Sequence, residues 1–247
     1  MIVAVASGKG GTGKTTVALS LAVSAPGPVE LLDCDVEAPN CHLFLRSTPG
    51  AREGVTLPVP VVSSARCTAC GVCGEVCQFG GIVVLPRGAH VVPSLCHGCG
   101  ACVRLCPEGA IWEGRRSLGE VVEGDRGEVR LVTGRLDVGQ ALSPPVVRAV
   151  RQRANGRGLV IVDAPPGTSC PVVATIRRAD YVILVTEPTA FGRHDLGLAV
   201  DVVRQLDLPF GVVVNRAGVG DDRVNRFCAE ARVPILEGGL RKVVAHR

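Results

Sequence analysis

The chain has 247 residues, of which 47% are hydrophobic and only 3% are Phe, Trp or Tyr. It can bury one large core, or one core with a small insertion, and its Val-, Leu- and Ala-rich composition suits buried parallel strands. The net charge of +4 does not indicate a nucleic-acid-binding surface, and no apolar run approaches the length of a membrane span.

The start of the chain and its cysteine content indicate a cytoplasmic protein. The first residues already form an apolar strand, without the charged segment and long apolar stretch of a signal peptide. Twelve cysteines in such a protein favour metal binding over disulfides.

A glycine-rich loop joins a strand expected over Ile2–Ala6 to a following helix. Gly8, four further residues and then Gly13, Lys14 and Thr15 match the phosphate-binding loop pattern. Glycines let backbone N–H groups converge on a phosphate, and the helix N-terminus adds a positive dipole end. Lys14 is expected at the β- and γ-phosphates, and the Thr15 hydroxyl at Mg²⁺. The nucleotide-binding residues expected in this loop are Gly8, Lys9, Gly10, Gly11, Thr12, Gly13, Lys14, Thr15 and Thr16.

Lys9 is an extra lysine ahead of the usual one, and with it the loop resembles the deviant phosphate-loop ATPases. This group includes MinD, ParA, Mrp and the nitrogenase iron protein. The resemblance implies a doubly wound, mostly parallel α/β sheet of the SIMIBI type and Mg-dependent ATP hydrolysis that is slow or stimulated by a partner. It also implies an ATP-dependent homodimer, in which Lys9 reaches the partner's nucleotide and acts in catalysis with Lys14.

A second buried strand, expected over Val29–Leu32, ends in an acidic segment that includes Asp33 and Asp35. Carboxylates at the carboxyl end of a parallel strand lie where open α/β sheets bind ligands. In the resembled family this segment is the first switch, so Asp35 is expected to orient or activate the attacking water, and Asn40 to lie near the nucleotide. The alternative is an acidic loop that only caps an element. Cys34 is expected to be a small buried side chain rather than a ligand.

From about residue 63 the composition changes, and two cysteine runs of identical spacing follow. They are Cys67-x2-Cys70-x2-Cys73-x3-Cys77 and Cys96-x2-Cys99-x2-Cys102-x3-Cys106. This is the spacing of bacterial ferredoxins with two [4Fe–4S] clusters, in which the fourth cysteine of each run ligates the other cluster. The ligands expected for the first cluster are Cys67, Cys70, Cys73 and Cys106. Those expected for the second are Cys96, Cys99, Cys102 and Cys77.

Zinc is the competing metal for these cysteines, but a tetrahedral zinc site needs only pairs of C-x2-C. The second run is followed by Pro107, whereas Gln78 follows the first, and we expect only small local changes in packing there. The backbone is expected to approach the clusters closely at four glycines, Gly71, Gly74, Gly98 and Gly100.

Residues 117–137 alternate apolar and polar side chains and predict a hairpin that returns the chain to the first domain. The predicted domains are therefore an ATPase domain formed by 1–62 and 138–247, an inserted small α+β two-cluster ferredoxin domain at 63–116, and the hairpin itself. With this insertion, the chain resembles MinD-superfamily ATPases that carry an inserted ferredoxin domain, and the resemblance covers nearly the whole chain.

A further strand, expected over Leu159–Val162, ends at Asp163. An Asp in this position binds Mg²⁺, directly or through water, in phosphate-loop NTPases. Gly167 follows two prolines and can bring its N–H to the γ-phosphate. In the resembled family this segment is the second switch.

The C-terminal half contributes further elements and one more candidate contact. Helices are expected over 143–151, 194–206 and 221–232, with strands over 181–185, 211–214 and 233–236. The resemblance places Asn215 at the adenine edge, although a turn asparagine is the simpler interpretation. The tail 240–244 is basic and slightly amphipathic, but a membrane-binding helix would be longer, so neither a membrane nor a nucleic acid is an expected partner.

These features predict an ATPase that couples its nucleotide state to electron transfer through two [4Fe–4S] clusters, with a redox or cofactor-assembly protein as partner. The cysteine runs lie between the Asp35 and Asp163 segments, so nucleotide state could bias the position of the cluster unit. One alternative is an Mrp-like iron–sulfur or metal-cofactor assembly factor, although Cys170 and Cys228 are isolated and do not suggest a shared labile cluster. Another is a spatial-organisation ATPase like MinD and ParA.

Overall fold

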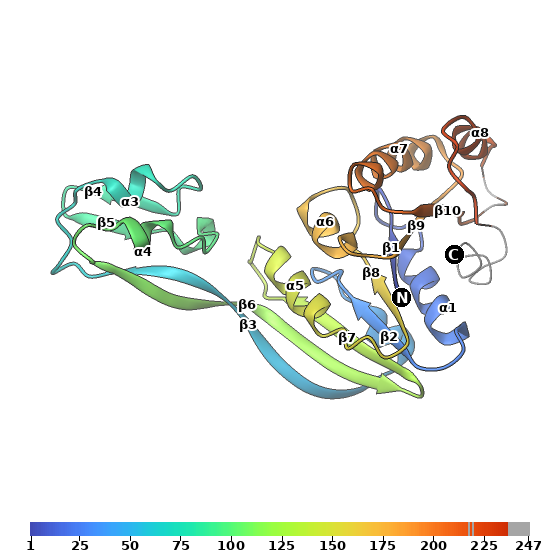
Figure 1. The fold of residues 1–247 in the computed structure, drawn as a ribbon, viewed down its shortest axis with the longest axis horizontal. Coiled ribbons are helices and arrows are strands. Elements are labelled where there is room, and N and C mark those ends of the chain that lie inside the picture. Colours follow the sequence, from blue (N-terminus) through green and yellow to red (C-terminus); the bar gives the residue numbers. More distant parts are fainter. Residues whose placement is uncertain (217, 219, 237–247) are drawn as a thin grey trace. The chain divides into compact units, whose positions relative to one another are not determined.

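The computed structural model describes residues 1–216, 218 and 220–236, and the chain divides into two compact units (Figure 1). Unit 1 comprises Met1–Glu53, Glu120–Arg135 and the described part of Val146–Arg247, and unit 2 comprises Gly54–Gly119 and Leu136–Pro145. All eight cysteines of the two runs lie in unit 2. The basic tail 240–244 lies outside the described residues.

Unit 1 is built on a sheet with the strand order β10-β9-β1-β8-β2-β7-β6-β3. The strands are β1 Ile2–Ala6, β2 Val29–Asp33, β3 Thr48–Val62, β6 Ile111–Arg126, β7 Val129–Leu136, β8 Leu159–Asp163, β9 Tyr181–Thr186 and β10 Phe210–Val214. Every pairing from β10 to β7 is parallel. The predicted α/β fold with a mostly parallel sheet is confirmed, while β3 and β6 continue from this sheet into unit 2.

Helices cover both faces of this sheet. They are α1 Lys14–Ser24, α2 Cys41–Leu45, α5 Pro144–Gln152, α6 Cys170–Ile176, α7 Ala190–Gln205 and α8 Arg223–Glu230. Successive side chains of a strand point to opposite faces of the sheet. On one face, Leu31 of β2 packs in the same core cluster as Leu21 of α1 and Leu45 of α2. On the other face α5 packs closely on β7, because a Cβ atom at Gly134 would lie 2.6 Å from Val150. Among the described helices, none is long and apolar enough to cross a bilayer.

Unit 2 consists of short elements around a small core. They are α3 Val72–Glu75, β4 Ile82–Leu85, β5 Gly88–Val91, a 3-10 helix at Pro93–Leu95 and α4 Ala101–Leu105, with β4 and β5 antiparallel. The core contains Cys73, Cys102, Ile82 and Ile111. The sequence repeat has a structural counterpart, because the glycines after Cys70 and Cys99 both adopt positive φ and immediately precede α3 and α4.

Several elements differ from those predicted. No strand was predicted over residues 48–62, but β3 occupies them and pairs with β6 at the edge of the sheet, although its Pro49 and Gly50 are residues typical of turns. The helix predicted from residue 194 begins at Ala190, because the Thr189 hydroxyl accepts a hydrogen bond from Gly192 N at 3.0 Å and caps it. The strand predicted over 233–236 is reduced to one bridge between Val212 and Ile235.

Helix α7 offers a matched test of which face supports the core. Leu196 is 2% exposed and Leu198 is 46% exposed. Leu196→Ala is expected to lower the free energy of unfolding by about 2–5 kcal/mol, because it leaves a cavity under the sheet. Leu198→Ala should cost less than about 1 kcal/mol. Urea denaturation measures both, and equal losses would contradict this packing.

Candidate functional site

The glycine-rich loop between β1 and α1 is held from two sides. A Cβ atom at Gly8 would overlap the backbone of Asp195 in α7, and one at Gly13 would overlap the Asn215 side chain. Asn215 Nδ2 donates a hydrogen bond to Thr12 O at 2.9 Å. The structure therefore places Asn215 against the phosphate loop, whereas its predicted contact with adenine stays a prediction. Of the other loop residues, Gly10, Gly11 and Thr16 are exposed.

The first turn of α1 meets the end of β8. Thr15 Oγ1 donates a hydrogen bond to Asp163 Oδ2 at 2.6 Å. The Lys14 side chain is buried, and desolvation lowers its pKa, although the charges of Asp163 and Asp35 act in the opposite direction. Four residues predicted from three separate segments are thus gathered at one edge of the sheet.

Asp33 and Asp163 form a buried acidic pair at this edge. They end β2 and β8, lie in register and are both fully buried. Burial, with a further contribution from the charge of Asp163, raises the pKa of Asp33 to about 7. Burial also raises the pKa of Asp163 to about 6, against the opposing effects of Thr15 and Lys14. Neither Oδ1 atom has a hydrogen-bond partner within the described part of the chain, so this edge can accept a cation.

Asp33 also fixes the segment that follows it. Its Oδ2 atom accepts hydrogen bonds from Asn40 N at 3.2 Å and Cys41 N at 3.0 Å. Cys41 Sγ in turn donates a hydrogen bond to Asp163 Oδ2 at 3.5 Å. Atoms of Asp33, Cys41 and Asp163 that could ligate a metal ion lie within 4.8 Å of one another. The sequence did not single out Cys41, because it begins a short helix that was not predicted. Cys34 is fully buried, as expected.

Lys9 and Gly167 have partners within the chain. Lys9 Nζ forms an ion pair with Glu187 Oε1 in the loop after β9, and Arg216 lies 3.4 Å from the other carboxylate oxygen. The hydrogen bond from Lys9 is the main cause of the lowered pKa of Glu187. Gly167 N donates to Ser7 O at 3.0 Å. Glu187 was not predicted, and its place directly after a strand was the only sequence signal.

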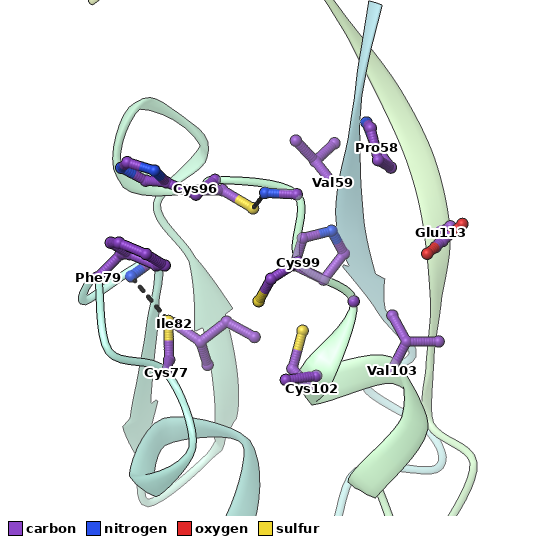
Figure 2. Close-up of a pocket in the computed structure, with 16 residues that line it drawn as sticks. Pro58, Val59, Cys77, Phe79, Ile82, Cys96, Cys99, Cys102, Val103 and Glu113 are labelled. Carbon is purple, nitrogen blue, oxygen red and sulfur yellow. Dashed lines mark hydrogen bonds between the residues drawn. The ribbon is translucent and has the colours of Figure 1, made fainter. Parts of the chain in front are cut away.

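The eight cysteines of unit 2 line two separate cavities. The cavity in Figure 2 is lined by Cys77, Cys96, Cys99 and Cys102. The other is lined by Cys67, Cys70, Cys73 and Cys106. Each cavity therefore combines three cysteines of one run with the fourth cysteine of the other run.

Backbone amides donate hydrogen bonds to the sulfur atoms of three of these cysteines. Gly81 N donates to Cys77 Sγ at 3.2 Å, Gly98 N to Cys96 Sγ at 3.4 Å and Ala110 N to Cys106 Sγ at 3.3 Å. Burial opposes ionisation of Cys77, but the amides of residues 79–82 outweigh it, and its pKa is lowered. At Cys73 and Cys102 burial dominates and raises the pKa. Metal ligation would offset that cost, because the thiolate is the form that binds.

The first cavity has an aromatic wall. The rings of Phe79 and His97 stack with their centroids 3.8 Å apart, and both residues line the cavity. Phe79 is labelled in Figure 2. Leu57 lies against Gly98, where there is no room for a side chain. Apolar side chains beside a metal group are one of the means by which a protein tunes it.

Residues 3–244 match the family model described as the CobQ/CobB/MinD/ParA nucleotide binding domain. The chain belongs to this family. Members of its MinD/ParA branch are ATPases, so the prediction of an ATPase is confirmed. Two uncharacterised proteins of Methanocaldococcus jannaschii are similar to this MinD/ParA-family chain. MJ0578 is 32% identical over 90% of this chain and 80% of its own length, and MJ0579 is 33% identical over 91% and 83%.

Solved structures support the same fold at low identity. The cell-division protein MinD of Pyrococcus horikoshii, complexed with Mg-ADP, aligns with a TM-score of 0.56 and 19% identity over 95% of this chain and 78% of its own. The cell-division ATPase MinD of Pyrococcus furiosus aligns with a TM-score of 0.53 and 20% identity over 95% and 80%. At these identities the likeness shows the MinD fold alone.

The buried acidic pair predicts the pH dependence of stability of this MinD/ParA-family protein in metal-free buffer. The pKa of Asp33 rises from 3.8 in the unfolded chain to about 7 in the folded chain. Protonated Asp33 therefore makes its full contribution to the stability of the folded state when the pH is below 3.8. This contribution is lost as the pH rises through the higher value. Relative to Asp33→Asn, the wild-type free energy of unfolding should therefore fall by up to about 1.4 kcal/mol per pH unit across that window.

Urea unfolding in the presence of a chelator measures this difference. Asp33→Asn cannot ionise at position 33 and should show a flatter profile than the wild type. Asp201→Asn removes an exposed carboxylate of α7 and should keep the wild-type profile. Parallel profiles for the wild type and Asp33→Asn would contradict the proposed burial cost.

Proposed function

We propose that unit 1 binds and hydrolyses Mg·ATP at the carboxyl edge of its sheet. The loop N–H groups and Lys14 would hold the β- and γ-phosphates, and Asp35 would orient the attacking water. This proposal is supported by the convergence of Lys14, Thr15 and Asp163 in one buried place. The remaining nucleotide contacts proposed are Asn40, Asn215 and Gly167. The N–H of Gly167 would leave Ser7 O to reach the γ-phosphate.

The donor set at this edge fits Mg²⁺. Hydroxyl and carboxylate oxygens are the ligands that Mg²⁺ prefers, and Thr15 and Asp163 supply one of each, already in contact. Asp163 Oδ1 is buried with no protein partner in the described chain, and a cation would satisfy it. When bound, Mg²⁺ neutralises charge on the β- and γ-phosphates.

We further propose an ATP-dependent homodimer in which Lys9 contacts the partner's nucleotide. Lys9 is held by Glu187 in this structure, but the pair is partly exposed, and such pairs contribute little to stability. A triphosphate carries more negative charge than one carboxylate and would compete for Lys9. Glu187 would then keep Arg216, which already lies beside it, as its ion-pair partner.

Unit 2 is proposed to be an inserted domain that holds two [4Fe–4S] clusters, one in each cysteine cavity. Each cavity offers four thiols, at least one of which accepts a backbone hydrogen bond, among apolar side chains, and this environment suits such clusters. The sulfur spacing argues against zinc, which at 2.3 Å from each sulfur would bring them to ~3.8 Å. Within the described residues, no three sulfurs of either set lie within 4.8 Å of one another.

The function that we propose is therefore a MinD/ParA-type ATPase whose nucleotide state controls electron transfer through a two-cluster unit. The observation that carries the redox part is the pair of cysteine cavities. The similarity to MinD and ParA proteins supports the ATPase part, and it fits a spatial-organisation ATPase better than an electron carrier. ATP-dependent sedimentation with DNA or liposomes would favour that alternative.

An iron–sulfur assembly factor is the third candidate. Cys170 is exposed in α6 and Cys228 is buried in α8, so they do not form a shared cluster site with one another in this chain. Transfer of clusters from the purified protein to an apo-acceptor would favour assembly, and retention would favour electron carriage.

Double cysteine variants test the assignment of clusters to cavities. Anaerobic reconstitution of the wild type should give about eight irons per chain, as two [4Fe–4S] clusters require. Cys73→Ser with Cys106→Ser removes ligands from one cavity and should leave about four irons. Cys73→Ser with Cys77→Ser removes one ligand from each cavity and should leave almost none.

Cys170→Ser is the control and should keep the wild-type iron content, because Cys170 lies outside both cavities. Iron and sulfide analysis with electron paramagnetic resonance measures all four proteins. Equal iron contents for the two double variants would refute the assignment. Stoichiometric zinc in place of iron would refute the clusters themselves.

A further inference from the structure

A third cavity, in unit 1, lies where α2 meets the β6–β7 hairpin and the start of β3. Its polar lining comes from His42, Ser47, Arg52, Glu123, Thr133 and Arg135. The space open to the centre of a water molecule is about 80 Å³. One water needs about 10–15 Å³ by the same measure, so the cavity has room for a larger polar molecule.

Two polar atoms in this cavity lack hydrogen-bond partners. Thr133 Oγ1 and His42 Nδ1 are both buried, and neither has a partner within the described part of the chain. Leaving such a group unsatisfied destabilises the folded state, so each calls for a ligand or water. Burial, followed by the charge of Arg135, lowers the pKa of His42, so its ring is neutral near pH 7. A neutral ring can donate or accept at Nδ1.

Two arginines give the cavity a positive charge. Arg52 and Arg135 both point a guanidinium at the same oxygen of Glu120, at 3.5 and 3.7 Å. Both arginine side chains are at least half exposed, and ion pairs of this kind are weak. The two guanidinium groups can therefore turn to another anion at little cost.

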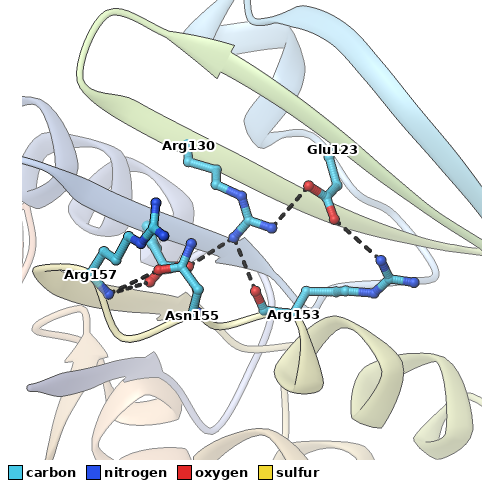
Figure 3. Close-up of polar contacts among 6 residues, drawn as sticks. Glu123, Arg130, Arg153, Asn155 and Arg157 are labelled. Atoms are coloured by element: carbon cyan, nitrogen blue, oxygen red, sulfur yellow. Dashed lines mark hydrogen bonds and ion pairs between the residues drawn. The ribbon is translucent and has the colours of Figure 1, made fainter.

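The acidic residue in the lining does not cancel this charge. Glu123 is already paired with Arg130 at 2.9 Å and with Arg153 at 3.4 Å, and these pairs are drawn in Figure 3. Its negative charge is thus compensated by cations that do not line the cavity. Arg52 and Arg135 share the single carboxylate of Glu120, which does not line the cavity, so the two guanidinium groups leave a net positive charge there.

We propose that this cavity binds a small anion that carries a phosphate or carboxylate group. Arg52 and Arg135 supply the charge, and Thr133 Oγ1 and His42 Nδ1 supply hydrogen bonds. The site is distinct from the phosphate loop but adjoins the switch segment. Thr133 lies in register with Asp33, and His42 follows Cys41, whose amide binds Asp33. A bound anion would therefore stabilise α2 beside the nucleotide site.

Thermal unfolding of the full chain with two probe anions tests the proposal. Saturating Mg·ADP fills the phosphate loop first, and inorganic phosphate or succinate is then titrated against chloride at equal ionic strength. At least one probe should raise the melting temperature with a saturable dependence. The probe that does so identifies the preferred group, and binding should occur whether or not the redox proposal holds.

Matched variants locate the effect. Thr133→Val keeps the side-chain shape and removes the hydroxyl, and Arg135→Gln removes one charge. Each should weaken the apparent affinity at least tenfold, whereas Arg126→Gln, at an exposed arginine of the same hairpin, should not change it. No shift beyond that of chloride would mean that the cavity holds water only. Either that result or equal shifts in Thr133→Val and Arg126→Gln would overturn the proposal.

Discussion

The buried pair of Asp33 and Asp163 is the constraint on which the nucleotide site depends. Two carboxylates side by side in a core are costly, and their raised pKa values record that cost. The surrounding groups reduce it, including the Thr15 hydroxyl, the Lys14 ammonium and the Cys41 amide. A cation at this edge would complete the compensation. The segment after β2 is therefore held by the same charges that a bound nucleotide and metal would change.

The sheet connects this acidic edge to the strands that continue into unit 2. Glu30 of β2 is buried and pairs with Arg130 of β7 at 2.8 Å. Arg130 also pairs with Glu123 of β6, and Arg153 after α5 joins the same network (Figure 3). Because β6 belongs to both units, the ion-pair network fixes one end of a strand whose other end lies among the cysteines. We propose this continuity of the chain as the route by which nucleotide state influences unit 2.

The sequence predicted the parts of the molecule that obey strong local rules. A loop that must expose its amides to a phosphate needs glycines, and strands buried on both faces need continuous apolar runs, so both could be recognised. It could not predict β3, whose Pro49 and Gly50 suggest a turn and whose pairing with β6 is a tertiary effect. Cys41 and Glu187 were missed for a related reason. Cys41 contacts Asp163 and Glu187 contacts Lys9, and both contacts join residues far apart in the chain. No local sequence pattern predicts such contacts.

We propose that nucleotide state and cluster chemistry are coupled in one chain. Redox titration of the reconstituted protein with and without Mg·ATP measures this coupling most directly, with Lys14→Ala as the uncoupled control. A shift in cluster midpoint potential with Mg·ATP in the wild type, absent in Lys14→Ala, is the predicted result. Identical potentials and electron-transfer rates with and without Mg·ATP in the wild type would contradict the account.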